Sequence, residues 1–226
     1  MKKKLNKTYF STSKVMGILN LTDNSFYDGG KFNNTDKILI QTKKMIDDGV
    51  NIIDIGAQSS KPNSDEISED EELSKIIPNL IEIRKRFPNV IISIDTYRAK
   101  VAEESINNGA DIINDISAGD FDENMVSVIA KYNVPYIIMH MLGNPKNMQR
   151  NPIYNNVVED IINYFQKKIE KLNDLGIHNL IIDPGFGFGK TLKNNYEILN
   201  NLEKFKCFKY PILVGVSRKS MIYKLL

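Results

Sequence analysis

The sequence predicts one α/β domain with the topology of a TIM-type (β/α)8 barrel, with seven strands present and the eighth missing. Short apolar runs alternate with longer amphipathic segments at about thirty residues per unit, as in parallel strands joined by right-handed helical crossovers. Polar residues follow the carboxyl ends of the runs, where barrels assemble their active sites. The 226 residues fit one barrel at the short end of the usual range, with residues 1–14 as an N-terminal segment.

Seven apolar runs predict the strands. Each has about five residues, too few for a helix, and ends in a polar or glycine-containing turn, which is typical of strands buried on both faces of a parallel sheet. The runs are Val15–Leu19, Asn51–Ile55, Val90–Ile94, Ile112–Ile116, Pro135–Met139, Leu180–Asp183 and Ile212–Val216. The sequence ends soon after the seventh run, so we expect a barrel that lacks the strand needed to close it.

Amphipathic segments between the runs predict helices. Apolar residues recur in them at helical spacing, and a glycine or asparagine follows as a stop signal. Pro78 lies inside the second segment, where we expect a kink or a second helical start. The expected helices are 35–48, 70–87, 99–108, 124–132 and 157–175.

The distribution of polar residues favours a barrel over an open doubly wound sheet. An open sheet concentrates its functional residues at a topological switch point, whereas a barrel spreads them around the carboxyl ends of all its strands. The residues at or just past the ends of the predicted strands are Asn20, Asp54, Asp95, Asn114, Asp115, His140, Asp183 and Ser217.

The composition indicates an ordinary globular protein and argues against binding to nucleic acid or a membrane surface. Apolar residues make up 42% and charged residues 26%, and 30 basic against 28 acidic side chains leave a net charge of +2. The basic run Lys2–Lys4 is interpreted as a solvated tail. No apolar stretch is long enough for a membrane span, and no apolar segment before Tyr9 indicates a signal peptide. The single cysteine, Cys207, cannot form an internal disulfide, so we expect a cytoplasmic protein.

Three carboxylates end predicted strands. Asp54, Asp95 and Asp183 each follow at least two apolar residues. A carboxylate in such a place is costly unless it is paired or binds something. Each one alone is equally well explained as an acceptor for the backbone amides of a neighbouring loop. Three on one rim favour a common small ligand that is rich in N–H donors.

Two further loops have the composition of binding loops. Asp183–Lys190 carries three glycines at alternate positions, which permits a close approach to a ligand, although the segment does not match a phosphate-binding P-loop. Ser217–Ser220 precedes a predicted helix, and its two cations and capping serine suit either an anion site or a solvated basic turn. His140 ends a predicted strand and suits either a structural or a functional role, whereas His178 lies in a loop and is interpreted as structural. Neither histidine has the spacing of a metal ligand or a recognisable catalytic partner.

Seven motifs occur in a fixed order between Val15 and the end of the sequence, one at each predicted strand end. They are Met16–Thr22 with Ser25-Phe26 and Asp28–Gly30, Asp54–Gly56 with Ser59–Pro62, Ser93–Thr96, Ile113–Ile116, Met139–Met141 with Gly143–Pro145 and Met148-Gln149, Asp183–Lys190, and Gly215–Ser220. The series resembles the signatures of the dihydropteroate synthase family. Seven motifs in one order are far more specific than any one of them.

The resemblance implies a reaction and a set of site residues. Such enzymes join (7,8-dihydropterin-6-yl)methyl diphosphate to 4-aminobenzoate, which gives 7,8-dihydropteroate and diphosphate in folate biosynthesis. On matching positions the resemblance implies that Asn20, Asp95 and Lys219 are catalytic, with Asn20 contacting the cofactor Mg²⁺. The substrate-binding residues that it implies are Ser60, Asp95, Asn114, Met139, Asp183, Phe188, Arg218 and Lys219. The expected partners are the two small-molecule substrates, and a homodimer is left open.

The residues at these positions suit the implied substrate, with three departures from the family pattern. A carboxylate such as Asp183 can accept two hydrogen bonds from a pterin edge, and Lys219 can donate to its ring carbonyl. Asp23-Asn24 replaces the usual first-loop pair, and Lys61 replaces an arginine, which exchanges a bidentate fork for a point charge. The family's final strand carries an Arg-x-His element that holds diphosphate, and the sequence ends before such an element.

Two alternative functions stay open at this point. One is a pterin-dependent methyltransferase domain that serves a corrinoid partner, which the Ser217–Ser220 turn and the Asn20–Thr22 segment disfavour. The other is a non-catalytic pterin-binding remnant, which binding without turnover would indicate.

Overall fold

A parallel sheet forms the centre of the molecule. The computed structural model describes residues 5, 8–21, 34–58, 66–144, 148 and 152–223. Within these residues the sheet has six strands in the order β1-β2-β3-β4-β5-β6. They are β1 (Met16–Asn20), β2 (Ile52–Gly56), β3 (Ile91–Asp95), β4 (Ile112–Asp115), β5 (Tyr136–Met139) and β6 (Leu180–Asp183). Because neighbours in the sheet are also consecutive along the chain, each connection crosses over outside the sheet, as the alternating pattern predicts.

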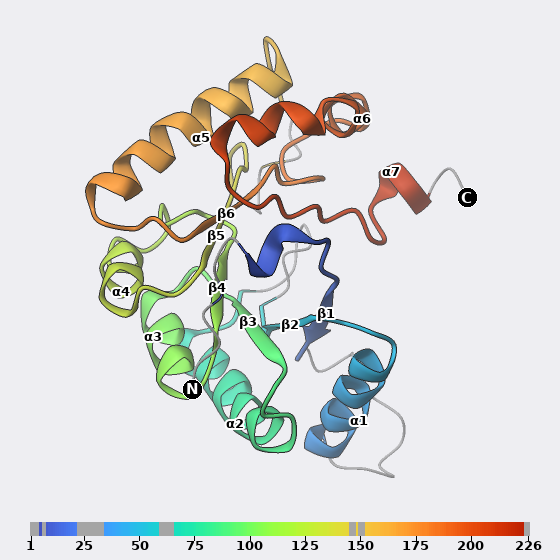
Figure 1. Ribbon diagram of the computed structural model, residues 1–226, viewed down its shortest axis with the longest axis vertical. Coiled ribbons are helices and arrows are strands. Elements are labelled where there is room, and N and C mark those ends of the chain that lie inside the picture. The colour runs from blue at the N-terminus through green and yellow to red at the C-terminus, as the bar shows by residue number, and fades with distance from the viewer. Residues whose placement is uncertain are drawn as a thin grey trace.

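Helices surround the sheet in chain order (Figure 1). They are α1 (Asn34–Asp47), α2 (Glu69–Arg86), α3 (Ala99–Asn107), α4 (Met125–Tyr132), α5 (Val157–Asp174), α6 (Leu192–Asn200) and α7 (Ser220–Tyr223), with the 3-10 helices η1 (Tyr9–Ser11) and η3 (Leu202–Phe208). The five predicted helices are confirmed, and α2 is a single helix that contains Pro78. Sequence reasoning missed α6, η1 and η3. No helix of the described residues is long and apolar enough to cross a membrane.

The two faces of the sheet differ in chemistry, because successive side chains in a strand point to opposite faces. The outer face, exemplified by Ile53 and Ile92, joins the large apolar core beneath the helices. At the amino ends of the strands the inner face carries a second apolar cluster, which contains Ile52, Ile91, Ile112, Ile137 and Ile181. Two residues further along the same strands, the inner face carries Asp54, Ser93, Asn114, Met139 and Asp183. The inner face is therefore apolar at its amino end and mostly polar at its carboxyl end.

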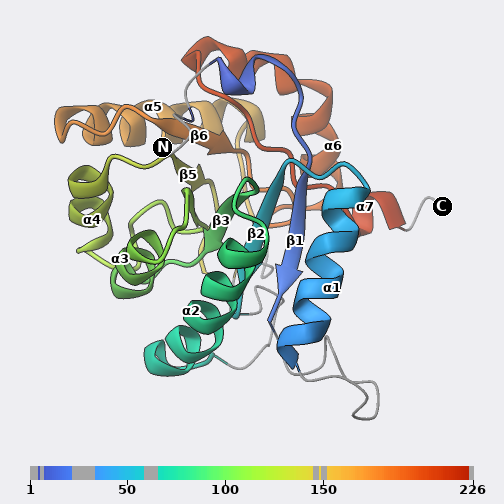
Figure 2. The same ribbon diagram turned by 60° about the horizontal axis from the view of Figure 1, so that its bottom comes forward.

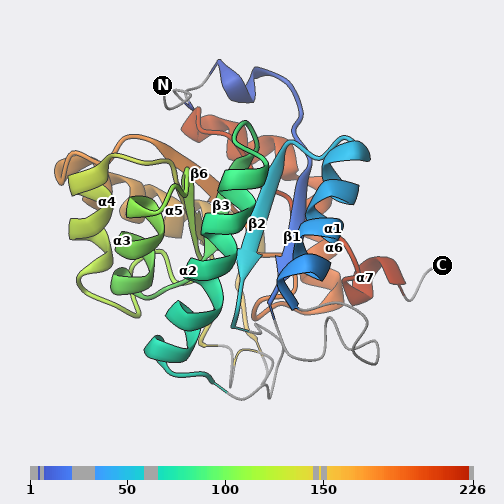
Figure 3. The same ribbon diagram turned by 90° about the horizontal axis from the view of Figure 1, so that it is seen from below.

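The N-terminal segment closes the amino end of the sheet. Leu5 is only 6% exposed and packs in the inner apolar cluster, with Tyr9 and Phe10 against it. The Asn179 side chain donates a hydrogen bond to the Leu5 carbonyl at 3.3 Å. Figure 2 shows η1 at the end of the sheet opposite to the arrowheads of the strands, and Figure 3 shows the same relation from a second direction. The N-terminal segment therefore covers the amino end of the inner face.

The described chain does not confirm the predicted seventh strand. Ile212–Val216 forms one isolated parallel bridge, between Ile212 and Ile182, instead of a strand. The Leu213 amide donates to the Ile182 carbonyl at 2.9 Å, and the Ile182 amide donates to the Pro211 carbonyl at 3.0 Å. Pairing stops there because β6 ends at Asp183 and the next residue, Pro184, has no N–H to donate. The segment therefore lies beside β6 in parallel orientation without extending the sheet.

Candidate active site

A row of residues in register forms one half of the polar rim. Asn20 on β1 pairs with Gly56 on β2, Gly56 pairs with Asp95 on β3, and Asp95 pairs with Asn114 on β4. A Cβ atom at Gly56 would lie 3.3 Å from the Asp95 carboxylate, so the glycine leaves room for that side chain. The strand register therefore brings together three residues that the sequence singled out: Asn20, Asp95 and Asn114.

A second polar layer lies deeper in the same face. Asn114 Nδ2 donates a hydrogen bond to Asp54 Oδ2 at 3.1 Å, and Ser93 lies between these strands on β3. Asp54 Oδ1 and Ser93 Oγ are buried and make no well-formed hydrogen bond among the described residues, although the Ser93 hydroxyl lies close enough to lower the pKa of Asp54. Buried polar atoms without partners are rare in native proteins and each needs an explanation, such as a bound ligand or water. Sequence reasoning gave Ser93 no role of its own, although its alternation with Ile92 and Ile94 put it on the same face as Asp95.

Burial and mutual repulsion make the two neighbouring carboxylates hard to ionise. Burial raises the pKa of Asp54, while contacts with Ser93 and Asn114 oppose this shift. Burial raises the pKa of Asp95 well above its ordinary value, and the negative charges of Asp54, Glu72 and Asp115 add to the effect. A site that holds two such carboxylates is prepared to receive N–H donors or positive charge.

The glycine loop after β6 forms the other half of the rim. Asp183 pairs in register with Met139 at the end of β5, and its Oδ1 accepts a hydrogen bond from the Gly185 amide at 2.7 Å. Gly185 has φ +73°, and a Cβ atom there would lie 2.0 Å from the His140 carbonyl oxygen. Only glycine fits this close approach of two backbones. The turn holds the Asp183 carboxylate at the rim.

Lys219 and Phe188 face each other beside Asp183. The Lys219 ammonium lies 4.4 Å from the centre of the Phe188 ring, and the lysine stem packs against Gly187. Burial lowers the pKa of Lys219, and the Asp183 charge opposes this shift. Burial likewise raises the pKa of Asp183 to about 6, although the hydrogen bond from the Gly185 amide and the charges of Lys190 and Lys219 lower it. An acid, a base and an aromatic ring therefore meet at one end of the sheet.

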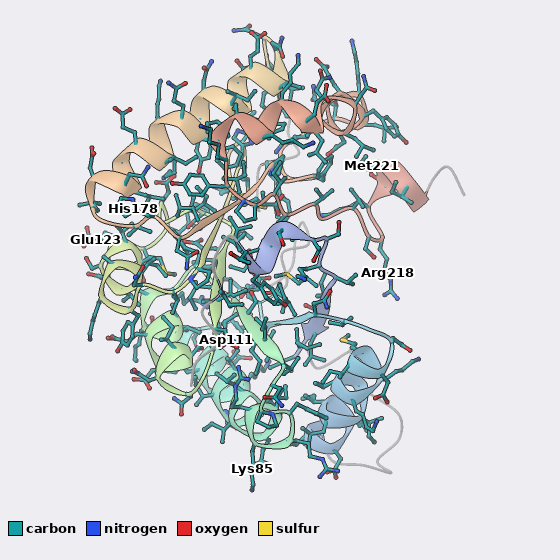
Figure 4. All side chains as sticks on the ribbon, viewed as in Figure 1. Lys85, Asp111, Glu123, His178, Arg218 and Met221 are labelled. Carbon is teal, nitrogen blue, oxygen red and sulfur yellow. The ribbon has the colours of Figure 1, made fainter. Side chains whose placement is uncertain are left out.

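Other singled-out residues lie elsewhere or outside the described residues. Arg218 has φ +55° and is exposed, and Figure 4 shows it projecting from the loop that precedes α7. His178 is exposed in the loop before β6, away from the rim (Figure 4). Ser60 lies outside the described residues, as do the parts of the first two motifs at 22–30 and 59–62.

Lys190 and His140 form a buried pair beneath the glycine loop that sequence reasoning did not assign to the site. Lys190 Nζ lies 3.1 Å from His140 Nδ1. Burial lowers the pKa of His140 to about 3, and the Lys190 charge adds to the shift. Lys190 closes the glycine motif, but sequence alone gives no sign that its ammonium turns inward.

Comparison with known proteins identifies the family. The chain matches the pterin binding enzyme family over residues 16–226. It is 47% identical over 214 residues to the dihydropteroate synthase of Haemophilus influenzae, which covers 94% of this chain and 77% of the relative. It is 48% identical over 210 residues to that of Clostridium beijerinckii, which covers 92% of this chain and 75% of the relative. The chain belongs to the dihydropteroate synthase family.

Solved structures of this family have the same fold. The Yersinia pestis dihydropteroate synthase in complex with a sulfonamide drug matches with a TM-score of 0.89 and 44% identity, over 96% of this chain and 78% of that chain. The Xanthomonas albilineans dihydropteroate synthase with 4-aminobenzoic acid matches with a TM-score of 0.88 and 31% identity, over 96% and 77%. The resemblance carried by the seven motifs is thereby confirmed.

Proposed function

We propose that the polar rim of the inner face is the pterin site of a dihydropteroate synthase, a transferase of folate biosynthesis. One observation carries this assignment to the rim. Asp54, Asp95 and Asn114 lie on neighbouring strands at the carboxyl end of the sheet, where a buried carboxylate oxygen of Asp54 has no hydrogen bond among the described residues. Asp183 ends β6 at the same end of the sheet, and the charge of Lys219 acts on it. The cluster offers acceptors for N–H groups on one side and an ammonium donor on the other.

This donor and acceptor pattern matches a pterin edge. A pterin presents an amino group and a ring N–H as donors, next to a ring carbonyl as acceptor. Asp183 is suited to accept the paired donors, and Lys219 to donate to the carbonyl. Asn114 supplies both an amide donor and an acceptor, and Phe188 and Met139 supply apolar surface for the ring. We assign these five residues to pterin binding.

The reaction transfers the pterin-methyl group from diphosphate to an amine. The C–O bond between the methylene carbon and diphosphate breaks, and the leaving diphosphate keeps the electron pair. The amino nitrogen of 4-aminobenzoate forms the new C–N bond and then loses a proton. Positive charge develops on the pterin-methyl carbon, and we assign Asp95 to its stabilisation, because a preorganised carboxylate in a sheltered site acts strongly on such charge.

Magnesium is the cofactor that we propose for the leaving group. Asn20 fits this role in part: its side chain is exposed at the carboxyl end of β1, and an amide oxygen is a suitable hard ligand. One neutral oxygen is a weak site by itself, so the diphosphate oxygens would supply most of the ligands. When bound, Mg²⁺ neutralises charge on the departing diphosphate.

The remaining assignments extend the proposal. Ser60 and Arg218 are proposed to contact the second substrate, 4-aminobenzoate. The protein is also proposed to be cytoplasmic and to form a homodimer. The fold is proposed to be a TIM-type barrel in which the segment Ile212–Val216 takes the seventh strand position. Its parallel bridge to β6 and the ring of helices around the sheet support this topology.

Diphosphate release in the presence of both substrates tests the function. The wild-type chain is expected to release diphosphate only when 4-aminobenzoate is present. Asp183→Asn is expected to abolish detectable pterin binding and to lower turnover, whereas Asp174→Asn, an exposed aspartate at the end of α5, should change neither. Binding of a pterin without any release of diphosphate would contradict the enzyme assignment and favour a non-catalytic pterin-binding protein.

A further inference from the structure

Lys190 is a buried cation that bonds only to neutral groups. It is 4% exposed, and its Nζ lies 3.1 Å from His140 Nδ1, 3.1 Å from the His140 carbonyl and 2.9 Å from the Phe188 carbonyl. An ammonium has three donors and no acceptor, so these three acceptors satisfy the charged form of Lys190 fully when His140 Nδ1 carries no proton. Its three hydrogen-bonding contacts among the described residues are all with neutral groups, and Asp183, the carboxylate whose charge acts on its pKa, is not one of them. A buried cation in such surroundings is costly, so its presence calls for an explanation.

Lys190 ties the glycine loop to the end of β5. It reaches Phe188 in the loop and His140 just past β5, and the His140 amide donates to the Asp183 carbonyl at 3.0 Å. Two other side chains also hold this loop. The Tyr154 hydroxyl donates to the Gly189 carbonyl at 2.8 Å, and Asn195 Oδ1 accepts from the Gly187 amide at 2.7 Å. Lys190 therefore belongs to the framework that fixes Asp183 and Phe188, and among the three side chains that hydrogen-bond this loop from the described residues (Lys190, Tyr154 and Asn195) it carries the charge.

We propose that Lys190 is a positioning residue of the pterin site, whose ammonium clamps the glycine loop and provides a counter-charge for the Asp183 carboxylate. This inference rests on the proposed role of Asp183 in pterin binding. Lys219 is the other cation near Asp183, and we have assigned its donors to the substrate. Lys190 directs all of its donors to the protein, so its charge acts on Asp183 whether or not a substrate is bound.

The charges around Asp183 determine how its ionisation responds to the loss of Lys190. Lys190 and Lys219 both lower the pKa of Asp183, which burial raises to about 6. His140 stays neutral, because burial lowers its pKa to about 3, and burial raises the pKa values of Tyr154 and Tyr164, which also stay neutral. Burial lowers the pKa of Lys190 itself to about 7, so below that pH it is mainly charged. Removing this cation therefore raises the pKa of Asp183 and leaves less carboxylate at any given pH.

Lys190→Gln separates the charge from the clamp. Glutamine keeps N–H donors for the carbonyls but carries no charge. The measurement is calorimetric affinity for hydroxymethylpterin between about pH 5 and 7.5, a range that spans the ionisation of Asp183. The wild-type chain should lose affinity as the pH falls through about 6. Lys190→Gln should move this midpoint upward by roughly 1 pH unit and weaken binding about tenfold near pH 6.

Two companion variants complete the test. Lys190→Met removes both the clamp and the charge, so it should shift the midpoint equally and also lower the melting temperature. Lys193→Met makes the same change at an exposed lysine of α6 and should match the wild type. If the pH midpoint of binding is the same in Lys190→Gln as in the wild type, the charge of Lys190 does not act on Asp183. The same conclusion follows if Lys190→Gln weakens binding by the same factor at every pH.

Asp183→Asn distinguishes this inference from the proposed function. If Asp183→Asn binds the probe as the wild type does, the assignment of the pterin site fails. If Asp183→Asn loses binding while Lys190→Gln keeps the wild-type midpoint, only the inference about Lys190 fails. If Lys190→Met does not fold, the glutamine variant still decides, because it retains donors for the loop.

Discussion

Lys219 Nζ lies 4.4 Å from the centre of the Phe188 ring, and this contact joins the segment after Ile212–Val216 to the glycine loop after β6. A cation over an aromatic face is held by the ring's negative charge density, which fixes the direction of the lysine without using its three donors. No hydrogen bond among the described residues uses those donors, which leaves them for a ligand. The ring thus aims Lys219 along the rim toward the place where Asp183 would hold a pterin.

Replacing Phe188 should therefore weaken pterin binding without unfolding the protein. In Phe188→Leu the lysine loses its support, and affinity for a pterin analogue should fall about 3–10-fold, the size of a cation–π contact. Calorimetric titration measures this change. Phe10→Leu is the matched control, because Phe10 packs at the amino end of the sheet. Equal affinities in the wild type and Phe188→Leu would show that the ring does not position Lys219.

Asp95→Asn should stabilise the folded chain while lowering its activity. The folded state raises the pKa of Asp95 through burial first and then through Asp54, Glu72 and Asp115. A carboxyl group with a raised folded-state pKa favours folding most at low pH, and this contribution is lost as the pH rises toward that pKa. Asparagine cannot ionise, so Asp95→Asn keeps its stability as the pH rises, and its amide can donate a hydrogen bond toward the Asp54 carboxylate. We expect a gain of roughly 1–3 kcal/mol in unfolding free energy at pH 8.

Chemical denaturation at two pH values checks this sign. The difference in unfolding free energy between Asp95→Asn and the wild type should shrink as the pH falls toward 4, where the wild-type carboxyl is protonated as well. The exposed Asp174→Asn should give a small difference that does not change with pH. A variant that is less stable than the wild type at pH 8 would contradict the argument from buried charge.

Much of the fold followed from the sequence because its signals are local. Run length and flanking turns are set within one strand, and six of the seven predicted strands are present. The seventh predicted strand is absent for a reason outside its own residues. Pairing beyond the single bridge at Ile212 needs an N–H donor on β6, and the residue that follows β6 is Pro184. α6 was missed because the segment Leu192–Asn200 is short and carries three asparagines, and its start depends on a capping box between Thr191 and Asn194.

Sequence reasoning placed site residues correctly only where they lie at the carboxyl ends of strands. Asp95, Asn114 and Asp183 could be placed on one rim because parallel strands bring their carboxyl ends together. Lys190 could not, because its acceptors come partly from His140, which is 50 residues away in the sequence. The missing partners of Asp54 and Ser93 are likewise a property of packing, which no sequence pattern contains.

Arg98 should be needed for stability because it neutralises a buried acid. Glu72 is 1% exposed and forms an ion pair with Arg98, which also donates to the Ile67 carbonyl at 2.5 Å. Arg98→Met leaves the Glu72 carboxylate buried without its partner, and the expected loss is roughly 3–5 kcal/mol of unfolding free energy. Chemical denaturation measures it. Lys100→Met removes surface ion pairs with Glu69 and Asp70 and should change the unfolding free energy little.

The double variant Arg98→Met with Glu72→Met isolates the cause. If the loss comes from an unpaired buried charge, removing both partners should recover most of the stability, because apolar replacements of a buried pair are often well tolerated. A double variant as unstable as Arg98→Met alone would instead assign the loss to the contact between Arg98 and Ile67.

Gly185→Ala should damage the rim, whereas Gly176→Ala should be mild. Both glycines have positive φ angles, +73° and +79°, so alanine is strained at both and costs roughly 1–2 kcal/mol. Nothing lies within 4 Å of a Cβ atom at Gly176, but a Cβ atom at Gly185 would lie 2.0 Å from the His140 carbonyl oxygen. The glycine loop of Gly185→Ala must therefore move away from β5. That movement pulls the Gly185 amide from Asp183 and the Phe188 carbonyl from Lys190.

The comparison of these two alanine variants separates backbone strain from displacement of the site. Gly176→Ala should lower the melting temperature by a few degrees, in keeping with a loss of about 1 kcal/mol, and should leave affinity for hydroxymethylpterin unchanged. Gly185→Ala should lose more stability and at least tenfold in affinity, because a displaced carboxylate gives up a charge-assisted hydrogen bond. Affinity is the deciding measurement, since strain alone acts on folding and not on the ligand. If Gly185→Ala binds as tightly as Gly176→Ala, the close approach to His140 does not fix Asp183 for the pterin.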